Sequence, residues 1–230
     1  MKHLITMLFL TVLSACGSVD YPNRPAGQFQ GQVFLMWVDD GGPDGQGVFL
    51  FIPNPHDPFR FTRAAAGQFQ TIEPAMIYTD GGSVPKLAQA FRGFSPWGYG
   101  PAYILHDWLF AARKCSNAGQ SDLGLTGIET MPFQTSADIL AEAIKTLIAE
   151  RRVSPDDVAP HLISAAVAGP ASNAIWTRDV TCSAVTPEDQ IAAEAAIPGA
   201  SQRTLRGTSR MTEDGEVPVK KARVIAAFSF

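Results

Sequence analysis

A histidine and an aspartate stand side by side in the most apolar helical segment of the chain. Residues 100–114 are apolar on nearly every side of a helix, and His106 and Asp107 lie near their centre. A helix that is apolar all round is a buried helix, and a buried ionisable group needs a partner. Neighbours on a helix point about 100° apart and cannot satisfy each other. We therefore expect the Tyr103 hydroxyl to serve Asp107, and a group from another element to serve His106.

A second polar segment, residues 78–85, precedes this helix and reads Tyr-Thr-Asp-Gly-Gly-Ser-Val-Pro. This segment supplies the candidate binding loop: Asp80, Gly81, Gly82 and Ser83. Tyr99, at the start of the apolar helix, is a further candidate residue of the same site. The segment equally fits a plain turn in which Ser83 caps a helix that begins at Pro85.

These segments resemble the bacterial and phage family called domain of unknown function 1353. Its members typically show Thr-Asp-Gly-Ala-Ser-Ile-Pro, then a helix ending in His-Asp-x-Leu-Tyr, then Ala-Asp near the start of a further helix. Here residues 79–85 read Thr-Asp-Gly-Gly-Ser-Val-Pro, residues 106–110 His-Asp-Trp-Leu-Phe and residues 137–138 Ala-Asp. The resemblance covers roughly residues 30–178. It offers His106 two carboxylates outside its own helix, and we expect Asp138, in preference to Asp80, within hydrogen-bond reach.

A looser similarity links the His-Asp helix to secreted calcium-dependent phospholipases. It implies His106 as the base that activates water, Asp138 as the carboxylate that orients it, and Asp107 as a ligand of calcium, the expected cofactor. The chemistry is coherent, because hydrolysis needs a held imidazole tautomer and a Lewis acid near the oxyanion. This chain lacks the cysteine-rich framework and the calcium loop of those enzymes.

Other polar residues have structural interpretations. Asp138 also fits the third position of a capping box begun by Thr135. His161 is expected at the surface of a helix, and His56-Asp57, between prolines, in a plain loop. The acidic loop 39–45 lacks the spacing of a calcium loop.

Two hypotheses for the function follow. The first is a lipid-anchored envelope hydrolase that acts through His106, Asp138 and Asp107. The second is a non-catalytic envelope or phage-derived module, in which the same cluster only staples the 79–85 loop to two helices. Access separates them: a catalytic His106 must open onto a cleft, whereas a structural one is sealed beneath Trp97, Tyr99 or Trp108. No substrate or protein partner is indicated.

The N-terminus has the pattern of an exported lipoprotein. A short basic start precedes an apolar run from Leu4 to Leu13, as in a secretory signal. Leu13-Ser14-Ala15-Cys16 then resembles the lipobox of bacterial lipoproteins, which implies lipidation of Cys16 and a membrane as partner. Gly17 after the cysteine favours the outer membrane, facing the periplasm. Residues 16–27 read as a flexible tether.

Two further cysteines, Cys115 and Cys182, would then remain in an oxidising compartment. There a disulfide is favoured over two free thiols. Such a bridge would tie the end of the His-Asp helix to the segment that follows the last helix.

The elements that must position these residues predict an α+β fold. Aromatic and β-branched runs between residues 32 and 78, separated by Gly, Pro, Asn and Asp, indicate an N-terminal antiparallel meander. Helices are expected over 100–114, over 136–152 with Glu142 on its polar side, and from Ser154 until Gly169-Pro170 interrupts the last one before Trp176. Three or four helices would thus form a layer on the meander.

Length and composition fit one domain, expected over 28–185, between a signal peptide (1–15) with its tether and a polar, partly mobile extension (186–230). With 46% hydrophobic and 17% charged residues, the chain is neither disordered nor a coiled coil. Its net charge of −4 gives no reason to expect nucleic acid as a partner.

Overall fold

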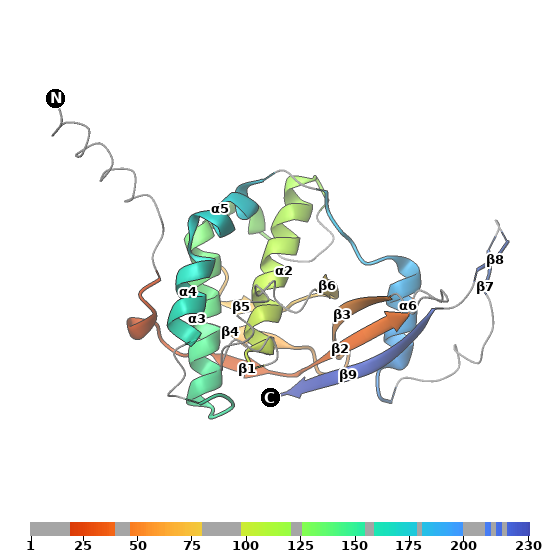
Figure 1. Ribbon diagram of the computed structural model, residues 1–230, viewed down its shortest axis with the longest axis horizontal. Coiled ribbons are helices and arrows are strands. Elements are labelled where there is room, and N and C mark those ends of the chain that lie inside the picture. Colours follow the sequence, from red (N-terminus) through yellow and green to blue (C-terminus); the bar gives the residue numbers. More distant parts are fainter. Residues whose placement is uncertain are drawn as a thin grey trace.

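The computed structural model describes residues 19–39, 47–79, 98–120, 126–154, 159–178, 181–199, 210–212, 215–217 and 220–230. Over these residues the protein has the predicted α+β fold, with antiparallel sheets and five α-helices (Figure 1).

The main sheet has four antiparallel strands in the order β6 (Ile77–Thr79), β3 (Gly47–Pro53), β2 (Gln32–Asp39) and β9 (Lys221–Ser229). Strands β2 and β3 pair continuously from Val33 opposite Pro53 to Asp39 opposite Gly47. The continuous apolar sequence of β2 arises because both of its faces are covered. Its two sets of alternating side chains enter two separate cores, one beneath α2 and the other beneath α6.

A smaller sheet has the order β1 (Gln28–Gln30), β4 (Arg60–Thr62) and β5 (Thr71–Ile72). The N-terminal strands therefore form two sheets instead of the single expected meander. Gly31, between β1 and β2, makes the change of sheet sterically feasible. Its φ is +80°, and a Cβ there would collide with the Pro58 carbonyl.

The helices contribute to the larger of the two hydrophobic cores. Helix α2 (Gly100–Asn117) and helix α3 (Phe133–Ala149), after the short η4 (Ile128–Thr130), pack together. Helix α4 (Ala159–Val167) ends just before Gly169-Pro170, and Pro170 begins α5 (Pro170–Thr177), which confirms the predicted interruption. No helix in the described part of the chain combines the length and apolarity needed to cross a membrane.

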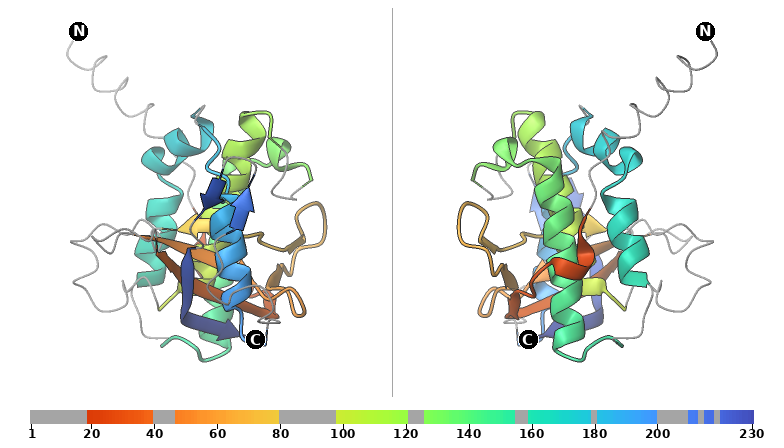
Figure 2. Two further views of the ribbon diagram at one scale, coloured as in Figure 1. Left: turned by 90° about the vertical axis from the view of Figure 1, so that its right-hand side faces the viewer. Right: turned by 90° about the vertical axis from the view of Figure 1, so that its left-hand side faces the viewer.

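Both expected domain boundaries need correction. Residues 19–27 are packed on the domain: Tyr21, in η2 (Tyr21–Asn23), is 6% exposed and lies against α4. At the other end, α6 (Pro187–Ala196) covers the second face of the main sheet, and β9 is its edge strand. Figure 2 shows η2, α3 and α4 on the side of the molecule opposite to α6. Strands β7 (Arg210–Thr212) and β8 (Gly215–Val217) pair with each other.

Candidate functional site

Helix α2 holds His106 in an apolar setting. The residue is partly buried, its Nε2 atom is buried, and its ring packs on Phe110 with the centroids 4.5 Å apart. No group in the described residues forms a hydrogen bond with Nε2. Desolvation by burial lowers the pKa of His106 from 6.5 to about 4. The imidazole is therefore neutral at pH 7.

Two of the aromatic residues expected to cover a structural His106 are buried. Tyr99, expected in the candidate binding loop, is 0% exposed and belongs to the core, as does Trp108 at 1%. Asp107, next along the helix, accepts a hydrogen bond from the Thr79 hydroxyl of β6 at 3.2 Å. This contact joins α2 to the end of the main sheet, at the point where residues 78–85 begin.

Asp138 lies on α3 and has other partners than the expected His106. Its Oδ2 atom is 3.0 Å from Nη1 of Arg24, and its Oδ1 accepts a hydrogen bond from the Gln134 side chain at 3.0 Å. The predicted hydrogen bond between Asp138 and His106 is thus absent from the described contacts. The reason is electrostatic: a carboxylate gains more from a guanidinium than from a neutral imidazole. The capping-box alternative is also wrong, because α3 begins at Phe133, two residues before Thr135.

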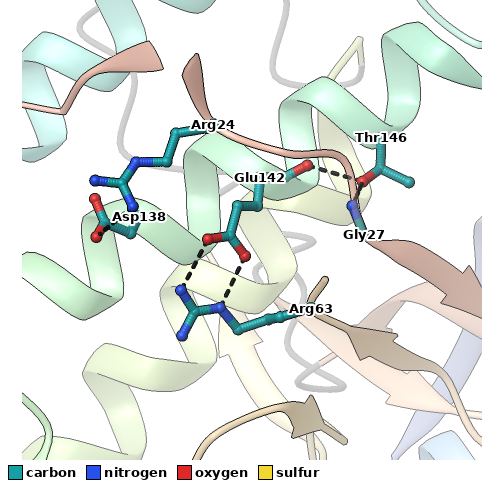
Figure 3. Close-up of polar contacts among 6 residues, drawn as sticks. All are labelled: Arg24, Gly27, Arg63, Asp138, Glu142 and Thr146. Atoms are coloured by element: carbon teal, nitrogen blue, oxygen red, sulfur yellow. Dashed lines mark hydrogen bonds and ion pairs between the residues drawn. The ribbon is translucent and has the colours of Figure 1, made fainter. Parts of the chain in front are cut away.

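One turn further along α3 lies an ion pair that the sequence did not reveal (Figure 3). Both carboxylate oxygens of Glu142 accept hydrogen bonds from the Arg63 guanidinium, each at 2.8 Å. Glu142 is 1% exposed and Arg63 11% exposed, so its predicted place on the polar side of the helix is wrong. The hydrogen bonds to Glu142 first, and the Asp138 charge in addition, hold the pKa of Arg63 above its usual value.

The next turn of α3 fixes the N-terminal segment. The Thr146 hydroxyl accepts a hydrogen bond from the Gly27 amide and donates one to the Glu142 carbonyl, both at 2.8 Å. A Cβ on Gly27 would lie 2.6 Å from Cζ of Phe61, so only glycine fits there without displacement. Asp138, Glu142 and Thr146 therefore bind two segments of the chain to one helix: the N-terminal segment, through Arg24 and Gly27, and the segment directly after β4, through Arg63. We interpret this cluster as a packing contact, because each charged group in it is paired with a group of opposite charge.

A second polar cluster joins α6, and Lys220 just ahead of β9, to strand β6. The Tyr78 hydroxyl donates to Asp189 at 2.6 Å and accepts from the Thr186 amide at 2.9 Å, and Lys220 donates to Asp189 at 2.8 Å. Burial alone would raise the pKa of Asp189, but the hydrogen bonds from Lys220, Tyr78 and Thr186 outweigh it and lower that pKa. Burial and the bond to Asp189 raise the pKa of Tyr78.

The predicted disulfide is confirmed: Cys115, in the last turn of α2, is bonded to Cys182, ahead of α6. His56 lies in an exposed turn and His161 on the exposed side of α4, as predicted.

Several predicted site residues lie outside the described residues: Cys16, Asp80, Gly81, Gly82 and Ser83. Within the described part, no group of three His, Cys, Asp or Glu side chains is placed to hold a metal ion.

Comparison with known proteins adds no relative: no family model, no curated protein and no solved structure matches the chain. The resemblance to the domain of unknown function 1353 and the similarity to phospholipases stay predictions from the sequence.

Proposed function

We propose that the protein is a non-catalytic module of the bacterial envelope, exported and held on a membrane by a lipid on Cys16. In this proposal the His-Asp helix is a packing element. The observation that carries it is the pairing of Asp138 with Arg24, which leaves His106 without the expected carboxylate.

The state of His106 supports the same function. A general base works best with a pKa near the operating pH and must reach its substrate. His106 has a pKa of about 4 and a buried Nε2. Such a group is a poor base for water at neutral pH.

Export is supported by the Cys115–Cys182 disulfide. Disulfides persist in secreted and periplasmic proteins and are rare where thiols are kept reduced. The apolar N-terminal run and the Leu-Ser-Ala-Cys sequence give the mode of attachment, and we propose the periplasmic face of the outer membrane as the site.

Carbethoxylation of histidines tests the packing role of the helix. We expect diethyl pyrocarbonate to modify the exposed His161 and His56 in the native protein, and His106 only after unfolding, as read from peptide masses. His161 is the matched control, because it also lies on a helix. Modification of native His106 as fast as His161 would contradict the proposal.

Fractionation tests the anchor. The wild-type protein should sediment with membranes and carry acyl chains on residue 16. The Cys16→Ser variant should be released or left unprocessed. A wild-type protein cleaved elsewhere and found free of membranes would contradict the lipid anchor.

The second candidate is a hydrolase, which one observation favours: a buried Nε2 without a partner in the described residues, beside Asp107. Buried polar atoms without a hydrogen-bond partner occur at functional sites. Calcium-dependent hydrolysis of phospholipid vesicles, abolished by His106→Gln, would support it over the packing role.

A further inference from the structure

Helices α4 and α5 present an outer face of unusual composition. Residues 159–177 contain no Asp, Glu, Lys or Arg. The exposed side chains of this α4–α5 face follow the i, i+3, i+4 spacing of one helix side on each helix. The aliphatic ones are Leu162, Ala165, Ala166, Ala171, Ala174 and Ile175; His161, Pro170, Asn173 and Thr177 of the same helices are exposed as well.

The face also holds two of the four large hydrophobic side chains that are exposed among the described residues. Leu162 is 56% and Ile175 42% exposed, whereas the other two, Val48 and Ile225, lie on strands of the main sheet. A single exposed apolar residue needs no explanation, but two large aliphatic side chains exposed on contacting helices without Asp, Glu, Lys or Arg favour an interaction site.

The first described residues of the chain lie beside this face. Tyr21 of η2 packs edge-on against His161 of α4, with the ring centroids 4.8 Å apart. Figure 1 shows η2, α4 and α5 together on the left-hand side, away from β9. Cys16 is three residues ahead of Val19, the first described residue. Three residues span at most about 11 Å when fully extended.

A lipid on Cys16 would therefore keep the bilayer within a short distance of η2 and α4. We propose that the α4–α5 face rests on the membrane to which the protein is anchored, with its apolar side chains in the interfacial layer. This inference depends on the lipid anchor of the proposed function.

The bilayer is favoured over other occupants by both position and chemistry. A short tether gives the face a high effective concentration at the membrane surface, so a weak apolar contact suffices to orient the domain. Leu162 and Ile175 supply apolar area, and the absence of Asp, Glu, Lys and Arg between residues 159 and 177 lowers the desolvation cost of approaching lipid.

Site-specific labelling tests the orientation on the intact acylated protein. Cys115 and Cys182 are bonded to each other and Cys16 would carry the lipid, so a newly introduced cysteine provides the free thiol. Ala166→Cys places a bimane label on the α4–α5 face, and Ala227→Cys places it on exposed β9 as a matched control. Both proteins are reconstituted into vesicles that contain brominated phospholipid. Flotation of the protein with the vesicles is measured first, and the fluorescence of the label is measured afterwards.

We expect bromine to quench the label at residue 166 and to leave the label at residue 227 unquenched. The paired change Leu162→Gln with Ile175→Gln should reduce the quenching at 166, whereas Val48→Gln with Ile225→Gln should not. Equal quenching at both labels in protein that floats would overturn this inference alone. A label at residue 166 that is shielded in proportion to protein density, and not quenched by bromine, would show that a second copy of the chain covers the face. That result would overturn the inference. Wild-type protein that fails to float would overturn the anchor and this inference together.

Discussion

Removal of the Glu142 carboxylate is the sharpest test of how the domain is held together. Glu142 is 1% exposed and accepts two hydrogen bonds from Arg63, itself 11% exposed. The change Glu142→Leu leaves the Arg63 guanidinium nearly buried without its bidentate partner. Breaking a buried pair in this way costs about 3–5 kcal/mol. Asp138 also interacts with Arg63, so we expect the lower end, about 3 kcal/mol.

The assay is urea unfolding followed by far-ultraviolet circular dichroism. With a slope of about 2 kcal/mol per M, a loss of 3 kcal/mol moves the midpoint down by about 1.5 M. The double change Arg63→Leu with Glu142→Leu should recover most of the loss, because a buried ion pair replaced by apolar side chains is often neutral.

The Arg60–Glu73 pair provides the matched control. Its side chains are 37% and 51% exposed and its atoms lie 3.0 Å apart. Exposed pairs contribute about 0–1 kcal/mol, so Glu73→Leu should scarcely move the midpoint. A Glu142→Leu variant as stable as Glu73→Leu would refute the reasoning, as would a double variant no more stable than the single one.

Three further predictions concern other parts of the fold. The disulfide closes a loop with a sequence separation of 67, and reduction should lower the free energy of unfolding by about 4 kcal/mol, as measured by urea unfolding with and without reductant; two reactive thiols in the unfolded, unreduced chain would contradict the bridge. Tyr78→Phe removes the hydroxyl between Asp189 and Thr186 and should cost about 1–2 kcal/mol, whereas an unchanged unfolding midpoint would contradict its role in holding α6. Because the folded pKa of His106 is about 4 and its ordinary value 6.5, the unfolded state binds the proton first as pH falls, so about 3 kcal/mol of stability should disappear between pH 6.5 and 4; His106→Gln should remove this dependence and His161→Gln should not.

The sequence predicts the helices and strands better than it predicts which side chains pair with each other. The apolar run around His106 is enough to predict α2, and the expectation of export to an oxidising compartment, with two cysteines beyond Cys16, is enough to predict the disulfide. Both conclusions depend on local pattern or on counting. The expected strands also occur, but their division into two sheets depends on the turn at Gly31, where Pro58 approaches from a distant part of the chain.

The errors have one physical origin, which is pairing between residues far apart in sequence. Glu142 read as solvent-facing because its partner, Arg63, is 79 residues away. The family resemblance predicts Asp138 beside His106, and nothing in the sequence marks Arg24 as a competing partner, because it lies in a Pro- and Asn-containing segment that is typical of a tether. The signal that could have corrected this was Tyr21, a lone aromatic residue in that segment, which is buried against α4.

Titration of His106 by NMR tests the central claim most directly, namely that this imidazole is a packing group with no carboxylate partner among the residues that the structure describes. The ring resonances of His106, assigned by comparison with His106→Gln, should report a neutral ring at pH 7 and a pKa near 4. Asp138→Asn should leave that value unchanged, because Asp138 pairs with Arg24. A pKa at or above 6.5 that falls in Asp138→Asn would show a His–Asp pair and contradict the account.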